Sequence, residues 1–360
     1  MCIGRRQFLF FLLLLTQGLQ ALACAICAPA DGQNTVLYRL HAADTAVLAQ
    51  LPGQGGAVRV LAQIKGPPPL APIDKIQGLV PAPATGSQEP VLLLYNAAGQ
   101  SWRAVGTLGL QRVAWLQHLA AMRPVGVAPV TDWPARLSMF VDDLEDPEPL
   151  VAQAAYEEVS VAPYSAMRSV RGRLVATRIQ RWLDAPALAA RRPLYTLLAG
   201  FAGGTDAAGD LRARMQRATQ DGSAASLSAA LAAYVEVLGT PGVAWIEEAY
   251  LARPDRTELE VQAAVMALGV HGTDGARVTR ERVVAAYARL AAGNPAMAGF
   301  AASDLAGWGH WDMGPVYAEI LGSGRPLAFA ARYAMVFYLL RSPRPDARTA
   351  IEALRAAKAL

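Results

Sequence analysis

Two patterns of hydrophobic and polar positions divide the chain, and one gives way to the other near residue 124. Before that point, short runs rich in β-branched residues alternate with turn signals, which is typical of strands. Helices are expected over residues 36–42 and 110–122. Four strands are expected, joined as two hairpins: residues 45–51 with 57–64, and residues 91–95 with 101–107.

After residue 134 the apolar positions recur with the 3.6-residue period of helices, and Pro and Gly mark the ends at regular intervals. Ala-rich apolar faces, such as the one around Ala263 and Ala267, permit close approach between helices. The pattern predicts stacked helical hairpins without a strict sequence repeat. The expected helices are 135–145, 149–160, 163–170, 174–183, 187–200, 206–219, 224–238, 241–252, 258–269, 279–291, 295–306, 313–321, 327–341 and 346–358.

The first residues have the features of an export signal. Two arginines precede an unbroken apolar run over residues 8–15, and small residues follow up to Ala23. Polar residues between 16 and 20 interrupt the run before it reaches the roughly 20 residues that a membrane span needs. We expect cleavage after Ala23 and a periplasmic or extracellular location. The adjacent arginines also fit twin-arginine export, and a lipid anchor on Cys24 is a further alternative.

Charge and length limit the classes of partner and architecture. The chain has 33 Lys and Arg against 29 Asp and Glu, without a long basic run, so no nucleic-acid partner is expected. Its 360 residues, 53% of them hydrophobic, exceed the roughly 250–300 residues that one core usually holds. We therefore divide it into a signal peptide (1–23), a β-rich domain (24–123), a linker (124–134) and a helical repeat domain (135–360).

The β-rich domain begins with a cysteine pair, followed by the helix at 36–42, the segment 43–50 and a run over 58–66 that ends in Ile-Lys-Gly. In this order the segments resemble the netrin-like module, the OB-type barrel shared with tissue inhibitors of metalloproteinases. The resemblance covers about 100 residues and lacks the further disulfides of the animal members. It implies a small OB-type β-barrel at the start of the mature chain.

The whole chain is also similar to an uncharacterised family of secreted bacterial proteins that have an N-terminal cysteine pair and a helical-repeat tail. That family has no assigned activity. The fold class expected is therefore multidomain, a small OB/netrin-like β-barrel followed by an all-α HEAT-like solenoid. The supporting stretches are residues 150–164, 181–184, 194–198, 308–312 and 332–343.

Cys24 and Cys27 form a CxxC pair, and no cysteine follows them. Residues three apart in a turn meet the roughly 4.4–6.8 Å Cα separation of a disulfide, and an exported protein meets oxidising conditions. So short a loop contributes only about 2 kcal/mol, so stability is a weak reason for this spacing. A plain disulfide is the leading interpretation. Thiol–disulfide exchange is the next, because CxxC spacing can lower the pKa of one thiol.

The same two thiolates could also bind copper or zinc, although two thiolates are only half of a structural zinc site. No histidine follows Cys27 directly, which excludes covalent haem attachment at a CxxCH motif, and no cofactor is expected. The remaining metal ligands would have to come from another chain or from the four scattered histidines, which are His41, His118, His271 and His310.

Residues 308–312, with the sequence Trp-Gly-His-Trp-Asp, form the most distinctive local cluster of the helical region. Trp308, His310 and Trp311 could line a ligand groove or anchor a partner. Packing between two helices is the alternative that the sequence favours, because large aromatic side chains usually fill cores.

No GxSxG, HExxH or GxxxxGK[ST] motif occurs in the chain, which lowers the expectation of an enzyme without excluding one. The sequence is best interpreted as an exported, non-enzymatic binding or scaffolding protein with a protein partner on its helical-repeat surface. The alternative is a periplasmic CxxC protein that exchanges disulfides or handles a soft metal, with the helical tail selecting the client.

Overall fold

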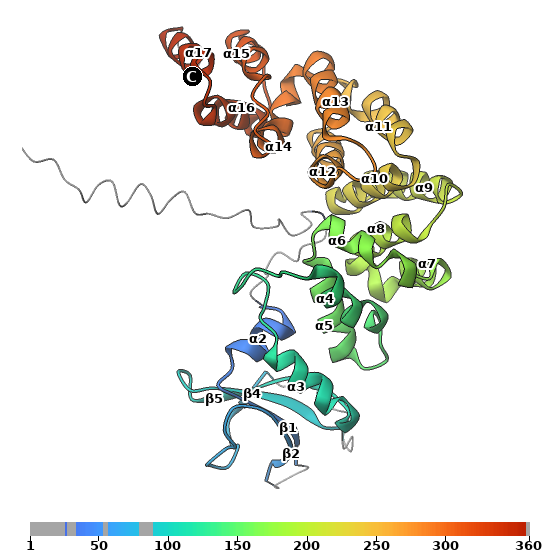
Figure 1. Cartoon of the computed structure of the whole chain (residues 1–360), viewed down its shortest axis with the longest axis vertical. Helices are drawn as coiled ribbons and strands as arrows, with labels where there is room; N and C mark the ends of the chain where they lie inside the picture. Colours follow the sequence, from blue (N-terminus) through green and yellow to red (C-terminus); the bar gives the residue numbers. More distant parts are fainter. Residues whose placement is uncertain (1–25, 27–33, 53–56, 79–88, 358–360) are drawn as a thin grey trace, which may run out of the picture. The chain divides into compact units, whose positions relative to one another are not determined.

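The computed structural model describes residue 26 and residues 34–52, 57–78 and 89–357. A small five-stranded sheet is followed by many helices, as the change of period along the sequence predicts (Figure 1). The chain forms two compact units, and their division falls between Ala166 and Met167, within the helical region. The first helices after the expected linker therefore belong to the unit that contains the sheet.

The sheet has the order β2-β1-β4-β5-β3, and every neighbouring pair is antiparallel except β3 with β5, which is parallel. Both predicted hairpins, β1 with β2 and β4 with β5, are confirmed. β3 was not predicted, because two residues in a Pro-rich segment are too short to show an alternating pattern. The strands are β1 (Thr45–Gln50), β2 (Arg59–Lys65), β3 (Ile76–Gln77), β4 (Val91–Asn96) and β5 (Ser101–Thr107).

The two central strands, β1 and β4, are buried on both faces. Val47 and Leu48 point to opposite sides of the sheet, and neither is accessible to solvent. Val47 and Leu93 belong to the core on one side, together with Trp102. Helices α2 (Val36–Ala42), α3 (Val113–Ala121) and α5 (Pro149–Ser160) contact the sheet strands or one another. Because both faces are buried, the sequences of β1 and β4 are continuous apolar runs and do not alternate between polar and apolar residues.

Two neighbouring carboxylates of α5 connect this helix to the rest of the first unit. Glu157 accepts a hydrogen bond of 2.6 Å from the backbone N–H of Val36, at the first residue of α2. Glu158 pairs at 2.6 Å with Arg136 of α4 (Trp133–Phe140), and both side chains are buried. Burial raises the pKa of Glu158, while the neighbouring guanidinium acts in the opposite direction.

The helical region consists of short helices whose ends agree closely with the Pro and Gly signals of the sequence. Residues 149–160 and 224–238 were predicted as helices with the limits that α5 and α10 have. The remaining helical segments are η3 (Val141–Asp143), α6 (Tyr164–Ser169), η4 (Arg171–Arg173), α7 (Ala176–Asp184), η5 (Pro186–Arg191), α8 (Arg192–Ala202), α9 (Ala207–Gln220), α10 (Ala224–Leu238), α11 (Thr240–Ile246), η6 (Glu247–Leu251), α12 (Glu258–Asp274), α13 (Arg280–Gly293), η7 (Pro295–Ala301), α14 (Ala302–Gly307), α15 (Gly314–Gly322), α16 (Phe329–Arg341) and α17 (Pro345–Ala356), with η2 (Leu110–Arg112) before α3.

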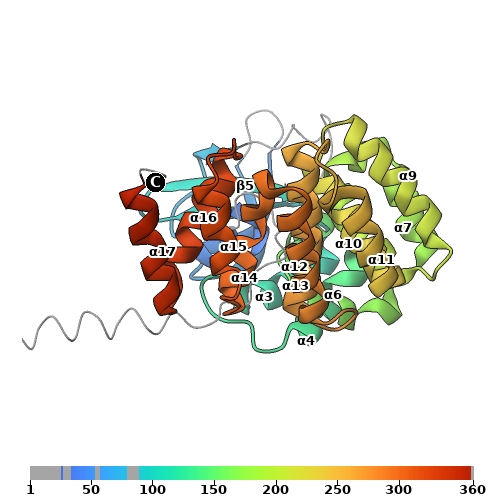
Figure 2. The same ribbon diagram turned by 90° about the horizontal axis from the view of Figure 1, so that it is seen from above.

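Within the second unit, helices contact both their neighbour in the sequence and the element one hairpin away. The helices α8, α10 and α12 pack in succession, and η7 and α16 continue the row. Of the remaining helices, α13 packs against α12 and η7, and α15 and α17 pack against α16 and against each other (Figure 2). In the part of the chain that the structure describes, none of the helices is long and apolar enough to span a membrane.

Small residues stand where these helices approach most closely. A Cβ atom added to Gly200 of α8 would lie 2.8 Å from the Cβ atom of Ala233 in α10. A Cβ atom added to Gly299 of η7 would overlap the carbonyl oxygen of Ala331 in α16. The sequence predicted Ala-rich faces, and these glycines, which it did not single out, also let helix backbones lie almost in contact.

The replacement Gly299→Ala is expected to lower the free energy of unfolding by about 3 kcal/mol, because the new methyl group would meet backbone atoms that cannot move alone. Urea unfolding followed by circular dichroism measures this change. The matched control is Gly307→Ala at the end of α14, where a Cβ atom meets nothing within 4 Å and stability should not fall. Equal midpoints for both variants and the wild type would contradict the close approach.

Candidate functional site

One face of α16 exposes four large apolar side chains to solvent. The helix buries Ala331, Met335, Tyr338 and Leu339 on the opposite side. The exposed side chains are four, four and three residues apart, a spacing that places them along one side of a helix. We call them the α16 stripe, with their exposed fractions: Phe329 (85%), Tyr333 (66%), Phe337 (49%) and Leu340 (55%).

Aromatic stacking and flanking arginines order the α16 stripe. The rings of Tyr333 and Phe337 are stacked, with centroids 6.3 Å apart and planes inclined by 12°. The guanidinium of Arg341 lies 5.7 Å from the centroid of the Phe337 ring, within the range of a cation–π contact. Arg332, which is also exposed, lies on the other side of the stripe at 100° per residue. Apolar side chains with a guanidinium on either side therefore form one surface.

The end of the chain that contains the stripe is strongly basic. Six arginines and only two carboxylates occur between residues 325 and 357, whereas the whole chain has 33 basic and 29 acidic residues. Arg344 forms exposed ion pairs with Asp312 at 2.8 Å and with Asp346 at 3.0 Å. The surroundings of the α16 stripe therefore have an excess of positive charge.

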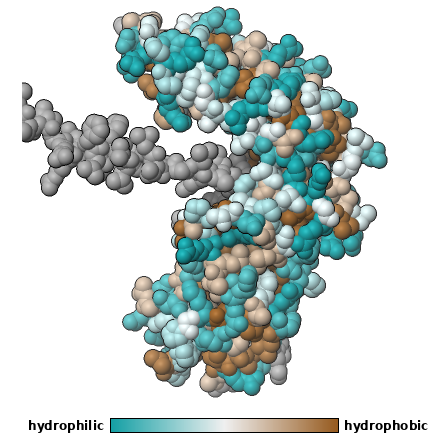
Figure 3. Space-filling view, in the orientation of Figure 1, coloured by the Kyte–Doolittle hydropathy of each residue, from teal (hydrophilic) through white to brown (hydrophobic). Residues whose placement is uncertain are grey.

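No other element among the described residues exposes such a run of apolar side chains. The remaining large apolar side chains that are well exposed, such as Leu70, Met139, Val175 and Met266, stand singly on separate elements. On the face drawn in Figure 3, apolar surface likewise occurs in separate areas among hydrophilic residues. Four exposed side chains on one helix are thus a distinct feature of this molecule.

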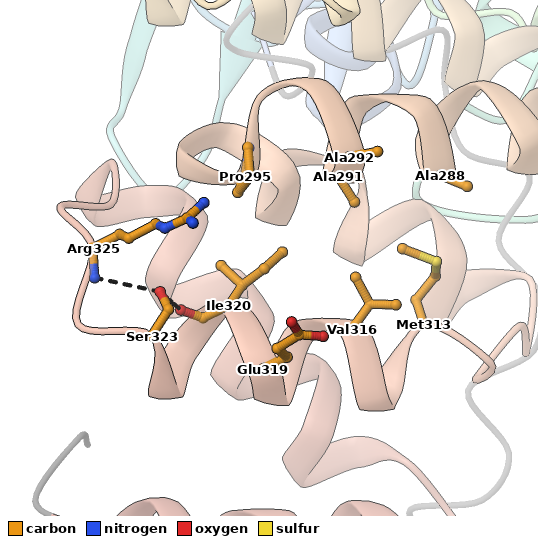
Figure 4. Close-up of a pocket in the computed structure, with 10 residues that line it drawn as sticks. All are labelled: Ala288, Ala291, Ala292, Pro295, Met313, Val316, Glu319, Ile320, Ser323 and Arg325. Carbon is orange, nitrogen blue, oxygen red and sulfur yellow. Dashed lines mark hydrogen bonds between the residues drawn. The ribbon is translucent and has the colours of Figure 1, made fainter.

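A groove of about 350 Å³ lies between α13 and α15 (Figure 4). Alanines of α13 line one wall, and Met313, Val316 and Ile320 line the other. Glu319, Ser323 and Arg325 supply the polar groups of the groove. The backbone N–H of Arg325 donates a hydrogen bond of 3.3 Å to Ser323 Oγ. The groove is mainly apolar, and it contains both a carboxylate and a guanidinium.

The structure places Trp308, His310 and Trp311 in the turn between α14 and α15, where all three are half-buried. The two indoles contact different helices. Trp308 stacks on Tyr287 of α13 at 5.9 Å, and Trp311 packs at 5.0 Å on Tyr338 of α16. The Tyr338 hydroxyl donates a hydrogen bond of 2.7 Å to the carbonyl oxygen of His310. This turn therefore connects α13, α14, α15 and α16.

Trp308 and the nearby Asp304 lie over two glycines of α12. A Cβ atom at Gly269 would overlap the carboxylate of Asp304, and one at Gly272 would overlap the Trp308 ring. The sequence predicted the end of this helix at residue 269, whereas the structure continues it to Asp274. The two glycines thus make room for side chains of the next hairpin and do not end the helix.

The Asp304 carboxylate shares the hydroxyl of Tyr287 with a backbone carbonyl. Tyr287 Oη lies 2.6 Å from Asp304 Oδ2 and 3.0 Å from the carbonyl oxygen of Val265. Burial raises the pKa of Asp304 to about 6, although the hydrogen bond from Tyr287 acts to lower it. Burial also raises the pKa of Tyr287, and the adjacent carboxylate adds to this effect. Asp304 is therefore a carboxyl group that holds its proton unusually well.

Cys24 and Cys27 lie outside the described residues, so the disulfide, redox and metal interpretations of this pair remain predictions. Ile26, between them, is described and is buried. His271 is fully buried, with Nε2 at 2.9 Å from the carbonyl oxygen of Ala232, and burial lowers its pKa to about 4. Among the residues that the structure describes, no three His, Cys, Asp or Glu side chains are grouped so that they could hold a metal ion.

The α16 stripe was missed in the sequence because α16 is apolar on nearly every side. Its buried and exposed faces have similar residues, so periodicity alone does not distinguish them. The recurrence of aromatic residues at 329, 333 and 337, with arginines on both sides, was the available signal. Comparison of the chain with known proteins found no matching family model, no matching curated protein and no matching solved structure.

Proposed function

We propose that this protein is an exported, non-enzymatic binding or scaffolding protein that holds a protein partner on its helical region. The observation that carries the proposal is the α16 stripe, which exposes Phe, Tyr and Leu side chains beside arginines. Tyr and Arg are enriched among the residues that contribute most to binding at protein interfaces. A soluble chain that leaves such a group open to water has a physical reason to cover it with another molecule.

The proposed architecture is an OB/netrin-like barrel followed by a HEAT-like solenoid. The sheet connectivity supports the first part, because β1 lies between β2 and β4, while β3 pairs in parallel with β5, so that an open five-stranded sheet needs only a β2–β3 contact to close. The row formed by α8, α10, α12, η7 and α16 supports the second part. Proteins of stacked helical hairpins offer long surfaces for partners, which agrees with a scaffolding role.

The proposed location is the periplasm or the cell exterior, on the basis of the expected signal peptide over residues 1–23. The proposed family is the one stated for the whole chain, secreted bacterial proteins with an N-terminal cysteine pair and a helical tail. The partner is proposed to bind on α16, in the C-terminal part of the chain.

Replacement of three stripe residues, Phe329→Ser, Tyr333→Ser and Phe337→Ser, is expected to abolish partner capture while leaving the fold intact. The three side chains are exposed, and the stacking and cation–π contacts that they make lie on the surface of α16 itself. Truncation of a central aromatic residue weakens interfaces by about 2 kcal/mol or more. The measurement is cross-linking of the tagged, exported protein in its host, followed by purification and quantitative mass spectrometry.

The matched control for this experiment is Leu70→Ser, which changes a fully exposed apolar side chain of the sheet-bearing unit. It should capture as much partner as the wild type, and all variants should show the wild-type circular dichroism spectrum. If the wild type recovers nothing above background after cross-linking, or if the triple variant recovers as much as the wild type, the proposed function is wrong.

A further inference from the structure

The chemistry of the partner can be inferred from the shape and charge of the α16 stripe. Resting on the proposed binding function, we propose that the stripe takes an amphipathic α-helix whose apolar face is bordered by Asp and Glu side chains. Three properties of the surface carry this inference: the spacing of the stripe, the position of its arginines and the charge of the helices next to it.

The spacing of the stripe fits a helix lying along α16. Phe329 and Leu340 are 11 residues apart, which at 1.5 Å per residue gives a straight row about 16 Å long. Side chains three and four residues apart form the ridges by which helices pack into the grooves of other helices. A partner helix of three to four turns would cover the row with apolar side chains of the same spacing. The exposed stripe thus has a spacing similar to that of the buried residues Ala331, Met335 and Tyr338 on the opposite side of α16.

The arginines beside the stripe indicate which side chains border the apolar face of the partner helix. Arg332 and Arg341 are exposed on opposite sides of the stripe, and Arg341 is already held over the Phe337 ring. These basic residues are arginines, as nearly all basic residues of the chain are, and arginine is the cation enriched in protein interfaces. The planar guanidinium binds a carboxylate through two parallel hydrogen bonds. Carboxylates on both sides of an apolar face would therefore meet a guanidinium on both sides of the stripe.

A second copy of this chain fits the stripe less well. Two stripes that face each other would bring arginines of one copy to the borders of the other, and like charges in an interface are unfavourable. A lipid surface also fits less well, because the neighbouring α17 exposes Asp346 and Glu352 as well as Arg348 and Arg355, so that it adds no net positive charge. Anionic headgroups that met the stripe would also meet these carboxylates. A partner helix, by contrast, needs to cover only α16 and does not have to meet the carboxylates of α17.

The test uses the full mature protein and two fluorescent helical peptides of equal length. The first has Leu and Ile along one face and Glu on both borders of that face, and the second has Lys at each of the Glu positions. Fluorescence anisotropy is expected to show at least tenfold tighter binding of the Glu peptide. The variant Arg332→Glu with Arg341→Glu should reverse this preference, and Phe337→Ser should weaken binding of the Glu peptide at least fivefold.

The matched control variant is Arg217→Glu with Arg289→Glu, which changes the net charge equally at exposed positions of α9 and α13. It should keep the wild-type preference, which separates a local effect from that of net charge. Vesicles of phosphatidylglycerol and sedimentation equilibrium test the other occupants. Equal binding of both peptides, binding of vesicles in preference to the Glu peptide, or a dimer that Phe337→Ser dissociates would each overturn the inference.

Failure of this inference is distinguishable from failure of the proposed function. If neither peptide binds but the cross-linked partner is still lost with the triple stripe variant, the partner is not an acidic helix and the binding function stands. If the Glu peptide binds as expected but no partner is captured in the host, the preference of the stripe for an acidic helix is supported and the proposed scaffolding function is wrong.

Discussion

Replacement of Arg168 by alanine is expected to lower the free energy of unfolding by about 3–5 kcal/mol, because it leaves two buried carboxylates without their cation. Arg168 donates from Nε and Nη2 to the two oxygens of Glu236, at 3.1 and 2.7 Å, and from Nη1 to Asp274. The side chains of Glu236 and Asp274 are only 8% and 4% exposed. This one guanidinium therefore joins α6 to both α10 and α12.

Urea unfolding measures the effect of Arg168→Ala. The matched control is Arg253→Ala, which removes an arginine from a well-exposed pair with Asp255 and should leave the midpoint unchanged. Replacing all three members, Arg168→Met with Glu236→Leu and Asp274→Leu, should restore much of the lost stability, because no buried charge then lacks a partner. A midpoint of Arg168→Ala equal to that of the control would show that the pairing of these charges contributes little.

The variant Asp304→Asn is expected to be more stable than the wild type at pH 8 and to lose this advantage near pH 4. Burial raises the pKa of Asp304 to about 6 in the folded protein, above its ordinary value of 3.8. Between these two pH values, Asp304 therefore keeps its proton in the folded state, whereas in the unfolded chain it has already released it. This contribution is fully present below pH 3.8 and is lost as the pH rises through 6, a total of about 3 kcal/mol.

Asparagine is neutral at every pH, so it does not share this loss, and its amide can take part in the hydrogen bond with Tyr287. The measurement is the difference in unfolding free energy between variant and wild type at pH 4.5, 6 and 8. The difference is needed because His271 acts oppositely: burial lowers its pKa to about 4, so its contribution is lost as the pH falls from 6.5. A difference that does not change with pH would contradict the buried protonated state of Asp304.

The sequence predicted the β-then-α order and most helix limits because these depend on local signals. Pro149 begins α5 and Gly239 follows α10, and both limits can be read without knowledge of the fold. Features that depend on distant segments were not predictable in the same way. Gly269 resembles a helix end in the sequence, and only the position of Asp304 shows why the helix continues.

The candidate site could be predicted only in part for the same reason. Trp308 and Trp311 were recognised by their residue type, but the helices that they contact follow from the tertiary fold. The stripe residue Phe337 and the buried Tyr338 are adjacent and similar in chemistry. Which of them faces solvent is decided by the packing of α14, α15, η7 and α17 around α16, and no single segment contains that information.

The two glycines of α12 also determine where α14 can lie. This helix has only six residues, too few to be stable by itself, so its position depends on its contacts. A slide of α14 by one turn would move the Asp304 carboxyl from Gly269 to Gly272, away from the Tyr287 hydroxyl that it meets now. It would also move the Trp308 indole from Gly272 to the end of α12, where the last helical residue is Asp274. These contacts therefore favour a single register between the two hairpins. This end of the helical unit should resist sliding of one hairpin past the other when the protein is under tension.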